Sequence, residues 1–399
     1  MIKLDLTITT EAPLVLRGTR GGSQFSPPLR YVPGTALRGA LAVEYLRNGG
    51  RPTDDHFRAL FLSDEVSYGP LFPCKEGKRA RPLPASAVAC KRYKGEHAAS
   101  IGDALLRLEL TSVLLESPGD GCRAPLATLA AWEGCPDCRD RYPGRLPNLR
   151  DRLEGYYVEE PFALVSTHTR LLTGVGMSRR TGTAAHRLLF SMGAIEEGQS
   201  FQGEVRLHGE EDRLQALLRE LAPPQGTLRL GGARSRGQGR VRVEGWTAAE
   251  NEAEPPLERR WRAFNEAVRR LWTASGLAPP QEDYFTLGVE SPLILRNAWL
   301  RPVRPADVDA QALGLPPGVE RRRAMLKEVT VRGWNVACGL PKEEMPAADA
   351  GSVFLFCAPV SLRASIQERL GQIEGYGAGE RRNEGFGRMI ACSPFHCRT

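Results

Sequence analysis

The chain has 399 residues, of which 41% are hydrophobic and 25% charged, a composition typical of a soluble globular protein with two to three domains. Its 54 Lys and Arg residues outnumber 47 Asp and Glu residues, but the net charge of +7 is too small to identify a polyanionic partner by itself. No segment approaches the roughly 20 consecutive apolar residues of a membrane span, and the first residues alternate like a strand rather than a signal peptide. We therefore expect a cytoplasmic protein without a membrane contact.

The first half of the chain predicts a β-α-β-α-β order that is interrupted by one insertion. Residues 3–9 alternate apolar and polar side chains, which indicates a half-buried strand. Pro33 stops the extended chain, and Thr35 can cap the helix that follows. Residues 50–160 have weak periodicity and many prolines, which is typical of an insertion. The later elements are a strand at 201–207, a helical face at 214–221, a strand at 227–230, a loop at 232–240 and a strand at 240–243. This order predicts a ferredoxin-like α+β domain over residues 1–247.

The insertion carries five of the nine cysteines, and their spacing indicates a metal site. Cys135-Pro-Asp-Cys138 is a C-x-x-C turn, whose two thiolates can chelate one Zn²⁺ in tetrahedral geometry. A redox dithiol usually stands at a helix N-terminus in a βαβ unit, which this segment does not resemble. Cys90 and Cys122 complete the predicted ligand set, with His97 and Cys74 as alternatives for the fourth ligand. Four protein ligands leave no open position, so we expect a structural zinc cofactor and no zinc chemistry.

The second half predicts a linker, a bridging helix and a shorter domain. Residues 248–258 are acidic and contain prolines, whereas residues 259–275 have apolar side chains at helical spacing, so residues 248–282 connect the two domains. The second domain covers residues 283–399. It begins with a strand at Tyr284 and makes a long excursion to about residue 350. A strand at 353–356, a helix at 362–373 and a glycine-rich loop follow.

The two halves repeat one another at two places. Residues 7–18 (TITTEAPLVLRG) and 286–297 (TLGVESPLILRN) have Thr, Glu, Pro, two Leu and Arg in register. Near the end of each half, a loop rich in glycine and arginine closes on Gly-x-Gly-Arg, at residues 232–240 and 377–388. A strand opener and a loop that recur in the same order indicate two copies of one small domain.

The repeated loop has a composition suited to a nucleic-acid backbone. Glycine lets another molecule approach the main chain closely, successive backbone N–H groups bind anions, and arginine matches phosphate and stacks on bases. No G-x-x-x-x-G-K-[ST] sequence is present, so we do not expect a P-loop nucleotide site. The alternative is a flexible hairpin with solvated arginines, but recurrence in both halves favours binding. The predicted nucleic-acid contacts in these loops and in one further arginine pair are Arg234, Arg236, Arg240, Arg381, Arg382, Arg388, Arg179 and Arg180.

These motifs together resemble the CRISPR-associated RAMP superfamily. Residues 32–39 (VPGTALRG) are similar to the family's I-P-G-S-S-L-K/R-G opening of its first helix, and the two glycine-rich loops match the family's C-proximal loops. Two fused RAMP domains with a Cys-bearing insertion look most like the group-5-related subunit of type III-D effector complexes. The resemblance implies a crRNA-binding subunit of a ribonucleoprotein in antiviral defence, which meets target RNA only indirectly. It also implies other RAMP subunits as neighbours, with the large polymerase/cyclase-like subunit as a further candidate.

The start of the predicted first helix is a second candidate contact with RNA. Gly34 lets RNA approach closely, and Thr35 can bind a phosphate together with the N–H groups of the helix N-terminus. Arg38 lies one turn further, and Arg17 and Arg20 approach from the preceding loop. The alternative is an ordinary capped helix that packs on its sheet.

The sequence favours a binding subunit over an enzyme. In backbone RAMPs that cleave target RNA, an Asp lies in the loop before the helix motif, whereas residues 18–30 contain no Asp or Glu. Asp307 and Asp309 lie in the corresponding loop of the second half, but no helix motif follows them. RNA-processing relatives use a His near the first helix, and no His occurs between Met1 and Asp55. An endoribonuclease for crRNA processing or target RNA cleavage stays an alternative, and a stand-alone zinc-containing adaptor protein is a second one.

Overall fold

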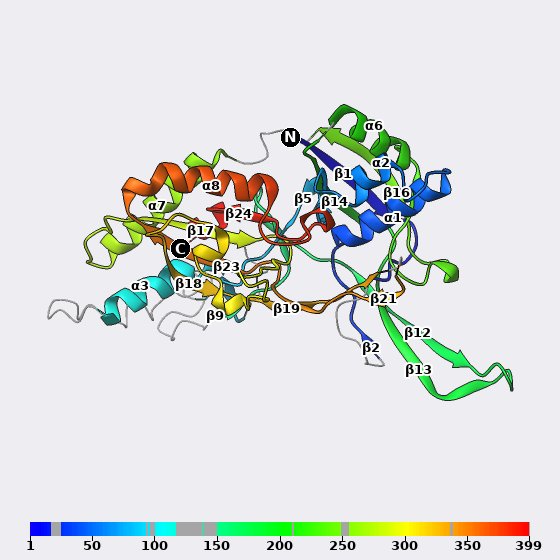
Figure 1. Ribbon diagram of the computed structural model, residues 1–399. Helices are drawn as coiled ribbons and strands as arrows, with labels where there is room; N and C mark the ends of the chain where they lie inside the picture. Colours follow the sequence, from blue (N-terminus) through cyan, green and yellow to red (C-terminus); the bar gives the residue numbers. More distant parts are fainter. Residues whose placement is uncertain are drawn as a thin grey trace.

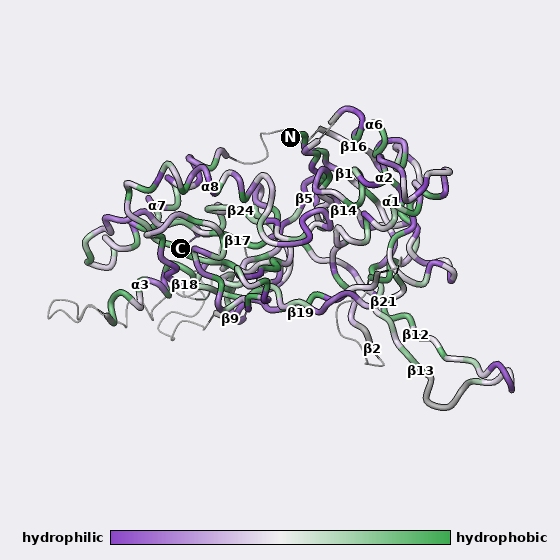
Figure 2. Tube along the Cα trace, viewed as in Figure 1, coloured by the Kyte–Doolittle hydropathy of each residue, from purple (hydrophilic) through white to green (hydrophobic). Residues whose placement is uncertain are grey.

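The structure is a computed structural model that describes residues 1–16, 25–92, 95, 100–116, 138, 150–209, 211–248, 255–335 and 338–398. Helices and antiparallel sheets form two halves, and the main sheet of each half has the same strand order (Figure 1). Figure 2 shows hydrophobic residues along the strands of both sheets, where the two main cores lie. No helix in the described ranges is both long and apolar enough to cross a membrane.

The main sheet of the first half is ferredoxin-like. Its central strands are β1 (Ile2–Thr10) and β14 (Ser200–Leu207), flanked by β16 (Arg240–Ala248) and β15 (Thr227–Arg229) on one side and by β3 (Val66–Tyr68) and β4 (Phe72–Lys75) on the other. Helices α1 (Gly34–Arg47), α2 (Asp55–Phe61) and α6 (Glu211–Leu221) contribute to its core. Leu4, Leu6 and Ile8 alternate along β1 and are fully buried in this core. The predicted α+β fold of the first half is therefore confirmed.

The main sheet of the second half repeats this strand order. Its order is β18 (Glu320–Met325), β23 (Val353–Ala358), β17 (Asp283–Val289) and β24 (Met389–Ala391), and α8 (Arg363–Tyr376) precedes the last strand. Where the first half has α1, the second half has two 3₁₀ turns, η4 (Pro305–Asp307) and η5 (Gln311–Leu313). The bridging helix α7 (Leu257–Ala274) packs on β17, where the Asn265 side chain donates to the Tyr284 carbonyl and accepts from its N–H, both at 2.8 Å.

Between β4 and the hairpin before β14, the chain leaves the first half and packs on the second. The strand β5 (Lys78–Arg79) still pairs with β4 at the edge of the first sheet. The elements that follow are β6 (Arg81–Pro82), β7 (Ala87–Cys90), β8 (Ile101–Asp103), α3 (Leu105–Glu116), β9 (Arg150–Arg152), β10 (Tyr156–Val158) and β11 (Ala163–Val165). Leu105 and Leu110 of α3 belong to the same core as Phe285 of β17. The buried Glu109 carboxylate accepts from Arg322 of β18 at 2.7 Å, which fixes α3 against the edge of the second sheet.

Each half also inserts a hairpin just before its third strand. In the first half β12 (Thr169–Met177) pairs with β13 (Ala184–Ile195), and β2 (Phe25–Ser26) adds to β13. In the second half β19 (Glu328–Val331) pairs with β22 (Met345–Ala348), and β20 (Trp334–Asn335) pairs with β21 (Leu340–Pro341). The first hairpin projects far beyond its domain (Figure 1). Further 3₁₀ turns in the described part of the chain are η2 (Arg234–Arg236), η6 (Val360–Leu362), η7 (Arg382–Glu384) and η8 (Pro394–Cys397).

Candidate nucleic-acid interface

The two glycine–arginine loops have one backbone conformation. We call residues 231–240 the first loop and residues 379–388 the second loop. Each contains a 3₁₀ turn between two left-handed residues. These residues are Ala233 (φ 55°, ψ 27°) and Gly237 (φ 79°, ψ 5°) in the first loop, and Arg381 (φ 58°, ψ 33°) and Gly385 (φ 89°, ψ 12°) in the second. Glycine adopts this conformation without the steric cost that other residues meet.

Both loops are held by hydrogen bonds to the repeated strand opener. The Gly239 N–H donates to the Pro13 carbonyl at 2.9 Å, and the Gly387 N–H donates to the Pro292 carbonyl at 3.0 Å. In the same way the Val15 carbonyl accepts from the first loop and the Ile294 carbonyl from the second. Pro13 and Pro292 occupy the same position in the two sequence repeats. The two motifs of each half therefore form one local unit, and the predicted duplication is confirmed.

The second loop docks against the first half of the chain. A Cβ atom added to Gly385 would lie 1.9 Å from the Tyr68 carbonyl oxygen at the end of β3, and a Cβ on Gly34 at the start of α1 would lie equally close to the same oxygen. The Ser67 hydroxyl donates to the Arg382 carbonyl at 2.8 Å. The close approach that Gly34 permits is therefore an approach to protein.

The arginines of the second loop have protein partners. Arg382 pairs with Asp64 of the first half at 2.8 Å, and its side chain stays 38% exposed. Arg381 pairs with Glu384 at 2.6 Å and lies over the Phe386 ring, 4.6 Å from its centre. Arg388 is only 4% exposed. These contacts place the second loop in the interface between the halves, a role that the sequence motif did not reveal.

Arg388 belongs to a buried cluster of charges between the halves. Its guanidinium donates to the Glu204 carboxylate at 2.9 Å, and Glu204 also pairs with Arg206 on the same strand. Burial alone would raise the pKa of Glu204, but the guanidiniums of Arg206, Arg388 and Arg79 outweigh it and hold the pKa well below its ordinary value. Burial and the adjacent Arg206 lower the pKa of Arg388 to about 9.

The first loop, in contrast, faces solvent. Arg234, Ser235, Arg236 and Gly237 are exposed. Arg236 lies 5.7 Å from the centre of the Phe190 ring, and Phe190 and Ala233 of the loop pack against the same small buried cluster. The first loop and the base of the β12–β13 hairpin therefore form one continuous surface.

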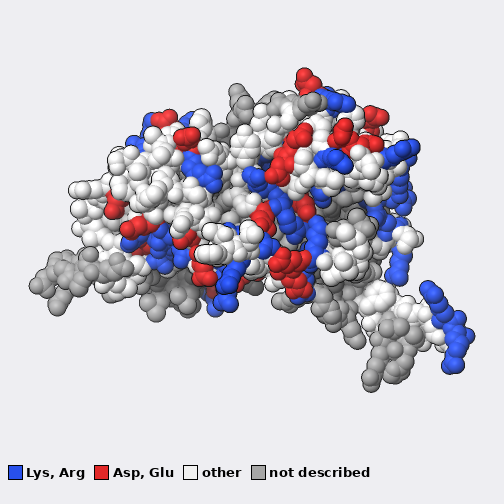
Figure 3. Space-filling model, in the orientation of Figure 1, with Lys and Arg blue, Asp and Glu red and all other residues white. Residues whose placement is uncertain are grey.

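Arg240 and the hairpin extend this surface. Arg240 pairs with Glu11 at 3.0 Å, but its side chain is 58% exposed. Arg179 and Arg180 are exposed in the turn between β12 and β13, and Figure 3 shows basic side chains at the far end of this hairpin. The hairpin also exposes large apolar side chains, namely Leu171, Val175, Met177 and Leu189. Basic and apolar groups on one arm suit a ligand that offers both phosphates and bases.

At the start of α1 the structure differs from the sequence prediction. Pro33 holds the N-cap position and no side chain caps the helix, so the prediction that Thr35 is the cap is wrong. The reason is that Pro33 has the extended conformation required there, whereas Thr35 already lies within the first turn. Arg38 donates from its guanidinium Nε to the Phe61 carbonyl of α2 at 2.9 Å. Arg17 and Arg20 lie outside the described residues.

Two of the four predicted zinc ligands lie side by side. Cys90 and Cys138 are buried, and their sulfur atoms are 3.6 Å apart. Cys122, Cys135 and His97 lie outside the described residues, and within the described part no three His, Cys, Asp or Glu side chains are grouped as metal ligands are. Cys74 lies on β4, where burial raises the pKa of its thiol to about 12 and keeps it protonated.

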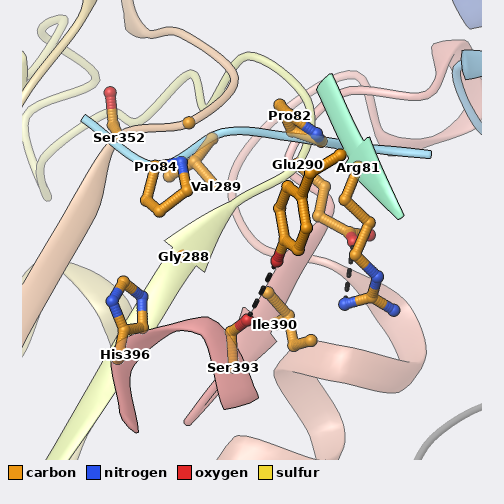
Figure 4. A pocket seen from close by; sticks show the side chains of 12 residues that line it. Arg81, Pro82, Pro84, Gly288, Val289, Glu290, Ser352, Ile390, Ser393 and His396 are labelled. Carbon is orange, nitrogen blue, oxygen red and sulfur yellow. Dashed lines mark hydrogen bonds and ion pairs between the residues drawn. The ribbon is translucent and has the colours of Figure 1, made fainter. Parts of the chain in front are cut away.

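Asp309 and His396 bond to other groups of the protein. Asp309 accepts from the Ala312 N–H at 2.7 Å, and Asp307 is exposed in η4. The buried His396 bonds to Asp103 through its Nδ1 atom. His396 also lines a cavity of about 30 Å³ between the insertion and β17 (Figure 4). That volume holds about one water molecule, so it is no substrate pocket.

A model of the RAMP superfamily matches residues 7–242, and no curated protein matches the chain by sequence. A chain of the type III-B Cmr-beta complex bound to cognate target RNA is 14% identical, with a TM-score of 0.42 over 94% of this chain and 95% of that chain. A chain of the Csm3–Csm4 subcomplex of the type III-A CRISPR-Cas interference complex is 12% identical, with a TM-score of 0.36 over 89% and 92%. A CRISPR-associated protein Cas6 is 8% identical, with a TM-score of 0.35 over 98% of both chains.

Proposed function

Because the chain belongs to the RAMP superfamily, we propose that it is a crRNA-binding, non-catalytic subunit of a type III CRISPR effector ribonucleoprotein. The resemblance to the group-5-related subunit of type III-D complexes rests on two fused RAMP domains with a Cys-bearing insertion in the sequence. The proposed protein partners of the chain are other RAMP subunits and the large polymerase/cyclase-like subunit. Target RNA would be met only through the guide.

One observation carries the RNA contact, namely a set of exposed arginines for which the described residues supply no carboxylate partner. Arg179, Arg180 and Arg234 have no carboxylate partner in the described part of the chain, whereas the arginines of the second loop are paired. An unpaired guanidinium keeps its donors free for phosphate. The first loop and the hairpin together therefore offer a basic path along the first half.

The same surface does not suggest a nuclease. Acid or base catalysis needs a titratable group at the bound backbone. Between Thr169 and Ala194 and between Thr227 and Val243 the sequence contains no Asp or Glu. His186 of β13 is the one histidine in these ranges, and no second acid or base accompanies it there. Glu11, which borders the first loop, is paired with Arg240. Asp307 and Asp309, the predicted alternative, belong to the second half. We therefore propose binding without cleavage.

The test is the salt dependence of RNA binding by the full chain. Each phosphate contact with a single strand contributes about 0.7 to the slope of log K against log salt. Replacing Arg179 and Arg180 with Ala should flatten that slope by about 1.4 and weaken binding across RNA sequences. The matched control is the Arg47→Ala/Arg262→Ala double variant, which removes two exposed arginines that already pair with Glu44 and Glu258. Equal slopes for the two variants would contradict the proposal.

We also propose that Cys90 and Cys138 bind a structural Zn²⁺. Two thiolates at about 2.3 Å from one tetrahedral ion lie about 3.8 Å apart, close to the 3.6 Å between these two sulfur atoms. Cys135 and Cys122 would supply the other ligands. A closed ligand set would hold the C-x-x-C segment against β7 and would take no part in a reaction.

A further inference from the structure

We propose that the first loop docks onto a second RAMP-superfamily subunit, in the way that the second loop docks onto the first half of this chain. The inference deepens the proposed function, because it assumes that such subunits assemble with the chain. It assigns a surface on the first half and a complementary surface on the neighbour.

The two glycine–arginine loops have the same conformation, but they differ in what covers them. Within the described residues, the second loop is covered by the first half of the chain and the turn of the first loop is exposed. The two loops share the left-handed residues, the 3₁₀ turn and the hydrogen bonds to their strand openers. The second loop uses this shape to pass Gly385 against Gly34 and the Tyr68 carbonyl. In the first loop the equivalent Gly237 is exposed, and a Cβ added there would have no atom within 4 Å.

The groups that make the occupied contact recur in the first loop. Arg382 contributes its carbonyl to Ser67 and its guanidinium to Asp64, and Asn383 donates from its side-chain amide to the Ser63 carbonyl at 3.3 Å. Their equivalents are Arg234 and Ser235, which have the same carbonyl, the same guanidinium and a hydroxyl donor. The Arg234 carbonyl now accepts from the Arg229 guanidinium at 3.5 Å, an exposed contact at the limit of hydrogen-bond length. Arg234 and Ser235 are both exposed.

The contact also defines the neighbour's surface. It needs a helix that begins with a Pro-Gly step, a strand that ends beside it with a free carbonyl, and an acidic side chain in the position of Asp64. A second copy of this chain does not fit. In the first half this surface already holds the second loop, and in the second half η4 and η5 replace the helix. The occupant is therefore a RAMP domain of another chain.

Docking of the turn is compatible with RNA contact by the arginines. In the occupied interface Arg382 remains 38% exposed while its carbonyl and its neighbouring glycine are covered. The same arrangement in the first loop would bury Gly237 and leave the Arg234 guanidinium at the rim. The two roles therefore require separate tests.

The experiment replaces Gly237 with Asn, which tolerates a positive φ and keeps the loop conformation. The new side chain has room in the isolated chain but would collide with a docked neighbour. Gly276→Asn is the matched control, because Gly276 has a φ of 77° and open space around it, at the end of α7. Each tagged full-length variant is co-expressed with RAMP-superfamily subunits of a type III effector complex from the same source. The retained subunit, the guide RNA and the thermal stability of the purified chain are then measured.

We expect Gly237→Asn to retain less than a tenth of the neighbouring subunit at unchanged thermal stability, and Gly276→Asn to retain all of it. A photo-crosslinking residue at Ser235 should attach to the helix start of the neighbour. Equal retention by the two variants, crosslinks to RNA alone or to another surface, or no co-purifying RAMP subunit with the unaltered chain would overturn the inference. The salt dependence of RNA binding by the Arg179→Ala/Arg180→Ala variant tests the RNA surface alone. Its result does not affect the retention of the neighbouring subunit, so the two proposals can fail separately.

Discussion

Replacing Glu204 with Gln should destabilise the interface between the two halves. The substitution keeps the shape of the side chain but removes the negative charge that Arg388 meets at 2.9 Å and that Arg206 and Arg79 also face. Glu204 and Arg388 have side chains only 12% and 5% exposed. Water therefore cannot replace the lost charge, and three guanidiniums would share the remaining carboxylates of the cluster.

The expected cost follows from this burial. Removing one partner of a buried ion pair costs about 3–5 kcal/mol, and we expect the lower end because Glu290 still faces Arg79 and Arg81. A loss of about 3 kcal/mol corresponds to a fall in Tm of about 6–12 °C for a domain of 150–250 residues. Thermal unfolding followed by tryptophan fluorescence measures this shift.

The pH dependence gives a second readout of the same substitution. The pKa of Glu204 is held below its ordinary value, so its contribution is fully present above the unfolded pKa of about 4.3 and is lost as the pH falls below it. The difference in Tm between Glu204→Gln and the unaltered chain should therefore be large at neutral pH and shrink below about pH 4. The control is Glu44→Gln, which removes an exposed pair with Arg47 and should cost less than about 1 kcal/mol. If the two variants melt alike, the buried cluster adds no net stability.

Two further predictions concern the same interface and the metal. Gly34→Ala should cost about 1–3 kcal/mol by overpacking against Tyr68 and should expose the connection between the halves to limited proteolysis. Gly39→Ala, in open space on the same helix, should stabilise the chain by up to about 1 kcal/mol; equal effects of the two would refute the steric argument. Elemental analysis should find about one zinc per chain, which Cys90→Ser should lose and Cys392→Ser should keep. Zinc retained in Cys90→Ser would exclude that residue as a ligand.

The sequence predicted the outer and central elements of each half where the signals for them are local, but it predicted no strands or helices within residues 50–160 and no β12–β13 hairpin. Alternation over residues 3–9 corresponds to β1, and the helical face over 214–221 corresponds to α6. The strand β18 was not predicted, because Glu320-Arg-Arg-Arg-Ala-Met325 lacks alternation. Tertiary contacts explain it: Arg322 pairs with Glu109 of α3, and Arg321 donates to the Val308 carbonyl. The side chains of this edge strand bind groups that are distant in the sequence, so its sequence does not need the alternation of apolar and polar residues by which strands are predicted.

For the candidate site, too, some features follow from the local sequence and others from tertiary contacts. By itself the sequence determined the duplication and the conformation of both loops, because glycine positions and the repeated opener act over a few residues. It could not distinguish Arg240, which is exposed, from Arg388, which is buried, since both end the same Gly-x-Gly-Arg motif. Only the tertiary structure decided that difference. The second loop contacts Gly34 and Tyr68, which precede it by more than 300 residues, and Glu204, which precedes Arg388 by 184 residues. These partners remove the loop from water, so a loop whose composition suits a ligand forms an interface within the protein.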